Sequence, residues 1–402
     1  MRLPLALCLF CAAACRSSLP YPSEAELARG VCSVVREPAF TLYSPYDSAA
    51  SAEFAQSVRT ELDLVRALIP DARTSALRLY LAPIEGPSDL QAWETPSNES
   101  LKGAATGGEY AFVYVPARLG ESSALERATY MRGGTLRHEL AHLCANRAGI
   151  EGAPWFNEGL ALEVESMREA GGELHAHPFP PYLLVARKTA KPGVLAELLH
   201  WPYADSLPQS ERSLRYVWAQ ALFRFLAEQQ PGQEFFERAR GVHSLTPSAL
   251  LERESAWLEW LGKLDALERI RAGADSASKE ERALCVGTMP SLAESRVPEL
   301  FTRGADKLAL AKLGDPVCTE SAATFLCFFR ARDLEARDLE ELEQSQDPLR
   351  VLTAQALHAR RKEPFELERA RAAWSRVPES ERGSLYVVAS LIPGLLAPDG
   401  HP

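Results

Sequence analysis

The sequence predicts an α+β domain followed by an all-helical domain, in a chain of 402 residues. Between residues 35 and 262, two segments with strand character lie among helical patterns. Residues 263–402 are rich in Ala, Leu, Glu and Arg and have almost no strand character. The hydrophobic content of 46% is that of an ordinary globular protein. The net charge of −10 argues against nucleic acid as a partner, because phosphate binding needs a basic surface.

The N-terminus predicts an export signal at residues 1–14. Arg2 precedes a mostly apolar run that is too short to span a bilayer but suits a signal peptide. Ala12-Ala13-Ala14 followed by Cys15 resembles a bacterial lipobox, which implies that Cys15 is lipidated and anchors the protein in the bacterial cell envelope. The anchor would hold it on the periplasmic side or at the cell surface. Cleavage by an ordinary signal peptidase and a buried N-terminal helix are the alternatives.

Export would place the cysteines of the mature chain in an oxidising compartment, where some should pair. Five follow the signal and Cys15, so at least one has no partner within the chain. Cys318 and Cys327 could pair with each other or with Cys285. A pair of Cys32 with Cys144 is conceivable.

The first domain is expected to follow a tether at residues 15–34, which are small, polar and Pro-containing. From residue 51 to residue 69, apolar residues recur at helical spacing, and Pro70 marks the end of that helix. LRLYLAP (77–83) and EYAFVYVP (109–116) are predicted strands, because they are rich in β-forming residues. The second is interpreted as an edge strand along which an extended peptide could pair.

The rest of the chain is predicted to be helical, apart from an irregular Pro- and Gly-rich segment at 171–210. Residues 263–402 are interpreted as stacked helix pairs without chemistry of their own, which suits a protein partner. Before them, the predicted helices are 125–148 with a break at Gly133-Gly134, Pro154 to about Ala170, Tyr182–Lys188, Val194–Leu199 and Tyr216–Gln230.

The stretch RHELAHLCANRAGIEGAPWFNEGLALEVES (137–166) carries the predicted chemistry. His138 and His142 lie one helical turn apart, so both imidazoles can reach one metal ion. Catalytic zinc takes three protein ligands and leaves a fourth position to water. Glu158, on the next predicted helix, can supply the third ligand, and Glu139 can act as general base. The alternative is an amphipathic helix whose histidines pack against acidic neighbours.

HELAH followed by WFNEGLA resembles the gluzincin branch of zinc metallopeptidases, including the peptidase-MA-like bacterial proteins. The resemblance covers about residues 35–262. It implies a zincin-like domain with a small mixed sheet, the HExxH helix, a helical subdomain and one zinc ion per chain, with Glu158 as the third ligand. No G-A-M-E-N motif supports aminopeptidase activity. Leu162 stands where thermolysin-like relatives have an acidic residue, so Glu163 or Glu165 is expected to hold a ligand histidine instead.

The same resemblance implies a donor to the oxyanion on a later helix, and Tyr216 in RYVWAQALFRFLAEQ is the matching residue. A tyrosine that only packs at a helix N-terminus is an equal alternative. His175 and His177 lie near the site in sequence and could donate to substrate or bind metal. They are expected to be exposed loop histidines instead.

The leading hypothesis is a membrane-tethered, extracytoplasmic zinc metalloprotease that acts on peptide or protein substrates. One alternative is a catalytically silent zincin-fold scaffold or binding lipoprotein. Another is a metallohydrolase that acts on a non-peptide bond.

Overall fold

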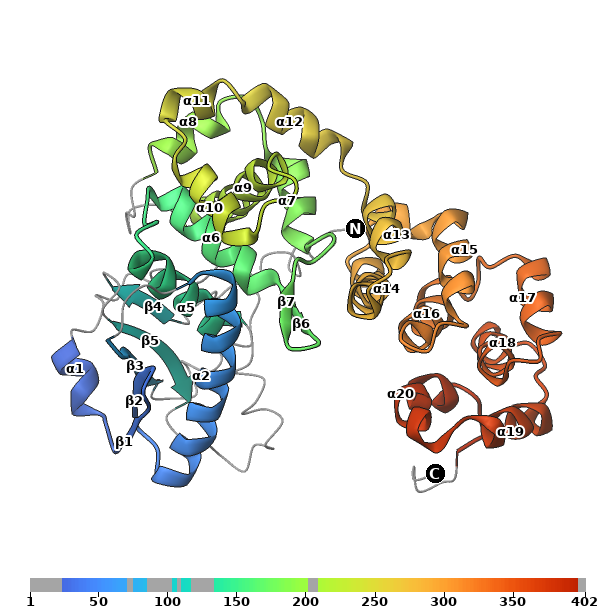
Figure 1. The fold of residues 1–402 in the computed structure, drawn as a ribbon. Helices are drawn as coiled ribbons and strands as arrows, with labels where there is room; N and C mark the ends of the chain where they lie inside the picture. The colour runs from blue at the N-terminus through green and yellow to red at the C-terminus, as the bar shows by residue number, and fades with distance from the viewer. Residues whose placement is uncertain are drawn as a thin grey trace. The chain divides into compact units, whose positions relative to one another are not determined.

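The computed structural model shows an α+β protein (Figure 1) and describes residues 24–70, 75–84, 103–106, 110–116, 134–201 and 209–396. The chain forms two compact units. Unit 1 comprises residues up to Ala176 together with Pro180–Leu264, and unit 2 comprises His177–Phe179 together with Asp265–Pro402. The expected export signal and Cys15 lie outside the described residues. No helix in the described ranges is long and apolar enough to cross a membrane.

Unit 1 contains a mixed sheet with the strand order β1-β2-β3-β5-β4. Its strands are β1 (Ser33–Arg36), β2 (Phe40–Ser44), β3 (Leu77–Ile84), β4 (Gly103–Thr106) and β5 (Tyr110–Pro116). The three central strands β2, β3 and β5 are parallel, and the outer strands β1 and β4 are antiparallel to their neighbours. The strands expected at 77–83 and 109–116 are confirmed.

The expectation that 109–116 is an edge strand is wrong, because β5 lies between β3 and β4. Its continuous apolar and aromatic sequence is that of a strand buried within a sheet. The edge strand on this side of the sheet is β4, whose sequence GAAT has no β-branched or aromatic run to reveal it.

Helices cover both faces of the sheet (Figure 1). Along β3, Tyr80 and Ala82 pack with Leu27 of α1 (Glu24–Arg29). The alternate residues of β3 point to the other face, where α2 (Ser48–Leu68) packs against β1 and β2. The helix expected at 51–69 is therefore confirmed, and it ends just before Pro70.

The prediction of a tether at 15–34 is wrong for residues 24–34, the part that the structure describes. The Glu24 carboxylate accepts a hydrogen bond from the Tyr80 hydroxyl at 2.7 Å and pairs with Arg78 at 2.7 Å. Residues from Ser33 onward belong to β1. The contacts of Glu24 are made with β3, where Tyr80 is 56 residues further along the chain, so local composition does not reveal them.

The helical part of unit 1 is built around α6. Its helices are α5 (Gly134–Arg147), α6 (Pro154–Ser166), α7 (Pro181–Thr189), α8 (Val194–Leu199), α9 (Gln209–Glu228), α10 (Phe235–His243), α11 (Pro247–Leu251) and α12 (Glu254–Lys263). Helix α6 packs on α5 on one side and on α9 on another. Helix α5 begins at Gly134, which has a φ of +54°, and the part of the expected helix before it, 125–133, lies outside the described residues.

Helix α6 ends at Ser166, although the sequence predicted that it continues to about Ala170. Residues Arg168–Ala170 form β6, which pairs with β7 (Glu173–His175) across a two-residue turn. Gly171 and Gly172 both have positive φ in that turn, which glycine tolerates and a tight hairpin requires. The hairpin therefore takes the residues that the helical pattern would have used.

Unit 2 consists of helices in the described residues, as expected. They are α13 (Ala266–Ala274), α14 (Lys279–Glu294), η2 (Pro298–Phe301), α15 (Arg303–Lys312), α16 (Thr319–Phe325) with the π-helical turn η3 (Leu326–Arg330), α17 (Ala336–Glu343), α18 (Pro348–Arg361), α19 (Leu367–Arg376) and α20 (Glu379–Ser390). Successive helices pack as pairs, α13 with α14, α15 with α16, and α17 with α18.

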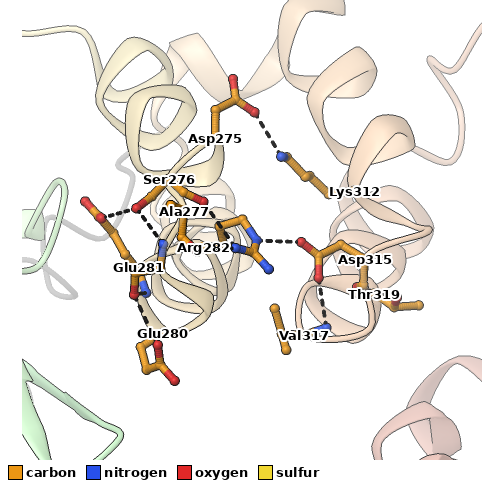
Figure 2. A network of polar contacts seen from close by, with 11 residues as sticks. Asp275, Ser276, Ala277, Glu280, Glu281, Arg282, Lys312, Asp315, Val317 and Thr319 are labelled. Atoms are coloured by element: carbon orange, nitrogen blue, oxygen red, sulfur yellow. Dashed lines mark hydrogen bonds and ion pairs between the residues drawn. The ribbon is translucent and has the colours of Figure 1, made fainter.

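Charged side chains connect the first two helix pairs of unit 2 (Figure 2). The Arg282 guanidinium, near the start of α14, donates to Asp315 at 2.8 Å. Lys312, at the end of α15, pairs with Asp275 at 2.9 Å. Both bonds join one pair to the next, so they support the stacking of pairs that the sequence predicted.

The five cysteines in the described part of the chain are thiols, so the disulfides expected among them are not formed. Cys32 is exposed, whereas Cys144, Cys285, Cys318 and Cys327 are buried. Burial raises the pKa of the Cys285 thiol, with smaller contributions from Glu281 and Cys318. The buried thiols act here as small apolar side chains of the core.

Candidate metal site

Three side chains from α5 and α6 converge on one point. The Nε2 atoms of His138 and His142 lie 3.1 Å apart. Oε2 of Glu158 lies 3.4 Å from the first nitrogen and 3.5 Å from the second. One ligand atom from each residue is thus within 4.8 Å of the others, and the group could hold a metal ion. The helices α5 and α6 pack against each other, which brings Glu158 to the two histidines.

The Glu165 carboxylate fixes the proton on one of the two imidazoles. Its Oε2 lies 3.0 Å from Nδ1 of His138. Because an ionised carboxylate only accepts hydrogen bonds, Nδ1 carries the hydrogen and Nε2 of a neutral His138 offers a lone pair. That lone pair faces His142 and Glu158. Of the two acidic residues that the sequence offered for this contact, Glu165 makes it, and Glu163 instead accepts a hydrogen bond from Tyr182 at 2.7 Å.

The donor set fits a cation. Two imidazole nitrogens and a carboxylate oxygen meet where His138 and Glu158 are almost fully buried. Burial by itself would raise the pKa of Glu158, but the adjacent imidazoles of His142 and His138 outweigh it and hold the pKa below its usual range. The site thus favours an ionised Glu158, which is the form that binds metal.

Glu139 lies beside this group and is fully buried. Neither of its carboxylate oxygens has a hydrogen-bond partner among the described residues. Burial raises the pKa of Glu139 to about 8; His138 opposes this rise, and Glu158 and Glu165 add to it. A buried carboxyl with a raised pKa next to a group of convergent ligands is typical of a functional position.

The residues of Asn-Glu-Gly each have a separate structural role. Asn157 closes the turn between α5 and α6: its Oδ1 accepts from the Gly152 amide at 2.8 Å, and its Nδ2 donates to the Gly152 carbonyl at 3.0 Å. Glu158 points to the histidines. Gly159 lets α9 approach, since a Cβ there would lie 2.6 Å from the Ala219 carbonyl oxygen and 3.0 Å from Cβ of Phe223.

Gly159→Ala is therefore expected to destabilise unit 1 by about 3 kcal/mol, near the upper end of the usual cost of overpacking, because backbone cannot rotate out of the way. Gly262→Ala is the matched control: Gly262 is an exposed helical glycine, and a Cβ added there would meet nothing within 4 Å. The control should be neutral or stabilising by up to about 1 kcal/mol. Chemical denaturation measures both, and equal stabilities would contradict the close approach of α6 and α9.

Tyr216 lies about two turns into α9, which begins at Gln209, and it is buried. Its ring packs edge to face against Trp201, with ring centroids 5.0 Å apart. The helix expected to begin at Tyr216 begins earlier, so Tyr216 is not at a helix N-terminus as the alternative supposed, and the oxyanion role stays a prediction.

The two loop histidines are less exposed than the sequence suggested. His177 is buried, so the expectation of an exposed loop histidine is wrong for it. His175 is half-buried in β7, and its Nε2 lies 3.1 Å from the Ala170 carbonyl oxygen across the hairpin. The hairpin β6–β7, which the sequence did not predict, accounts for that contact.

Sequence reasoning missed two buried polar clusters beside the ligand helices. Arg137 pairs with Glu61 of α2 at 2.8 Å. On the α9 side of α6, Glu163 lies between the Tyr182 hydroxyl and the Arg224 guanidinium, which is 3.6 Å away. The available signal was an arginine or glutamate within helices that are otherwise apolar, since such a charge needs a partner when buried.

The chain matches no family model, no curated protein and no solved structure. The site is therefore interpreted from its own geometry.

Proposed function

We propose that this protein is a zinc metalloprotease, tethered outside the cytoplasm by a lipid on Cys15. The observation that carries the proposal is the spacing of the three ligand atoms, 3.1, 3.4 and 3.5 Å apart. Two ligands at about 2.1 Å from a tetrahedral zinc ion lie about 3.4 Å from each other. Two nitrogens and one oxygen are also a ligand set that zinc commonly takes in catalytic sites.

A zinc ion held by His138, His142 and Glu158 would acidify a water molecule and polarise the scissile carbonyl group. In this mechanism Glu139 accepts the proton of the attacking water and delivers it to the leaving amine. Neither oxygen of its carboxylate has another hydrogen-bond partner among the described residues, so both are available to that water. Tyr216 is proposed to donate a hydrogen bond to the oxyanion.

The strand β4 is the part of the sheet that suits an extended peptide substrate. It is an edge strand, it is antiparallel to β5, and it packs next to α5, the helix that carries both histidines. A peptide that adds to a sheet edge is held through its backbone, largely irrespective of its sequence. We therefore assign to β4 the role that the sequence had suggested for 109–116.

A catalytically silent metal-binding scaffold is the second candidate, and the burial of the site favours it. His138 and Glu139 have no exposed surface, and Glu158 is 1% exposed. Among the three ligand side chains, only His142, at 15%, has appreciable contact with solvent. A closed site of this kind holds a metal ion well but gives a substrate little access.

Metal content and peptide hydrolysis, measured together on the purified chain, test the proposal. About one zinc per chain with cleavage of casein or a peptide library supports the protease. One zinc without cleavage favours the scaffold. No bound metal after zinc has been supplied would contradict both candidates.

A further inference from the structure

Arg137 directly precedes His138, the first proposed metal ligand. Its guanidinium donates hydrogen bonds to two other parts of the fold. Its Nε donates to Oε2 of Glu61 at 2.8 Å, and its Nη2 lies 3.3 Å from Oε1 of the same carboxylate. Its Nη1 donates to the Met167 carbonyl at 2.6 Å. One guanidinium thus joins α5 to α2 and to the residue that ends α6.

This ion pair is buried, with the Arg137 side chain 5% exposed and the Glu61 side chain 2% exposed. Removing two charges from water costs free energy, and their attraction offsets that cost only when the geometry is good. Apolar side chains of similar volume often stabilise a core at least as much as a buried ion pair. What the pair adds is a defined geometry, because the rigid, planar fork of a guanidinium donates two hydrogen bonds to one carboxylate.

The geometry of this pair affects the proposed metal site through both α5 and α6. On α5, Arg137 is adjacent to His138. On α6, Met167 comes two residues after Glu165, whose carboxylate holds Nδ1 of His138 at 3.0 Å. Met167 is also where the chain leaves the helix, with an extended backbone (φ −64°, ψ 151°), so its carbonyl points away from the helical hydrogen-bond ladder. The bond from Arg137 therefore fixes the end of α6 that carries Glu165.

We propose that Arg137 is a positioning residue for the metal site. By binding Glu61 and the Met167 carbonyl together, it holds the end of α6 so that Glu165 orients His138 towards the ion. This inference rests on the proposed metal-binding function. It assigns no contact between Arg137 and the ion or a substrate.

The test is the full-length double variant Arg137→Met with Glu61→Leu, which removes both charges together and leaves neither of them buried alone. The matched control is Arg330→Met with Asp306→Leu in unit 2, where a similar buried pair is bonded at 2.6 and 3.0 Å. Zinc affinity is measured by competition with a chelator, and the visible spectrum of the Co²⁺-loaded protein reports the ligand geometry. Circular dichroism establishes that each variant is folded.

The expected result is a fall in zinc affinity of about 10- to 100-fold, as for loss of other partners that orient a ligand histidine, with an altered Co²⁺ spectrum. The unit 2 control should keep the affinity and the spectrum of the unchanged chain. A folded Arg137→Met, Glu61→Leu variant with unchanged affinity and spectrum would overturn the proposal.

Arg137→Lys decides the matter if the double variant does not fold. Lysine keeps a positive charge opposite Glu61, but a single ammonium group cannot reproduce the fork that reaches both Glu61 and Met167. Weaker zinc binding is expected, and unchanged binding would count against the proposal. If the unchanged chain binds neither Zn²⁺ nor Co²⁺, the metal proposal itself fails, and this inference fails with it.

Discussion

Glu139→Gln is expected to bind zinc as the unchanged chain does and to lose peptide hydrolysis by about 10²- to 10⁴-fold, the usual contribution of a general acid or base. The substitution keeps the size of a side chain that has no exposed surface, so the helix should pack as before. A carboxamide cannot accept the proton of the attacking water. Metal content tests the retained zinc binding, and turnover of a peptide substrate, measured on the same sample, tests the loss of hydrolysis.

The contrast for this variant is Glu165→Ala, which removes the partner of His138 at Nδ1. That change should lower metal affinity by about 10- to 100-fold, and excess zinc should largely restore turnover. Excess zinc should not rescue Glu139→Gln. Turnover retained in Glu139→Gln would contradict the role given to this residue.

Glu158→Ala is expected to lower zinc affinity by more than about 100-fold, beyond the usual effect of losing an outer-shell partner. Oε2 of Glu158 is the one proposed ligand atom from α6, and it lies within 3.5 Å of Nε2 of both histidines. Without it the two imidazoles alone remain, and both come from α5. The metal then no longer connects the two helices.

Thermal unfolding with and without zinc measures this loss directly. A ligand at a thousandfold excess over its Kd stabilises the folded state by about 4 kcal/mol. The unchanged chain should show that gain, and Glu158→Ala should show less than about 1.4 kcal/mol, because a 100-fold loss of affinity leaves only a tenfold excess over Kd. Glu169→Ala, an exposed glutamate of β6, is the control and should respond to zinc as the unchanged chain does. An equal gain in Glu158→Ala would remove Glu158 from the ligand set.

Local sequence patterns predicted the elements that position the site. The spacing of His138 and His142 on one helix, and the turn that leads to Glu158, depend only on helical geometry and chain length. The strands at 77–83 and 109–116 and the helix that ends before Pro70 were equally evident from local composition. These features are confirmed because each depends on residues close together in the sequence.

The predictions that were wrong concern pairing between segments, which the composition of one segment does not reveal. The composition of residues 24–34 suggested a tether, yet Glu24 bonds to Arg78 and Tyr80 on β3. The strand at 109–116 is central because the weakly patterned β4 pairs along it. The helix that begins at Pro154 ends early because a glycine turn returns the chain as β7.

The sequence by itself determined which residues could bind a metal ion and on which two helices they lie, because an i, i+4 pair and a following helix fix those relations locally. Only the tertiary structure decided which carboxylate orients His138, since Glu163 and Glu165 are two residues apart and point to different neighbours. It also decided why Gly159 must be glycine and what Arg137 holds together. Those answers depend on the approach of α2, α9 and the end of α6, which helix periodicity does not specify.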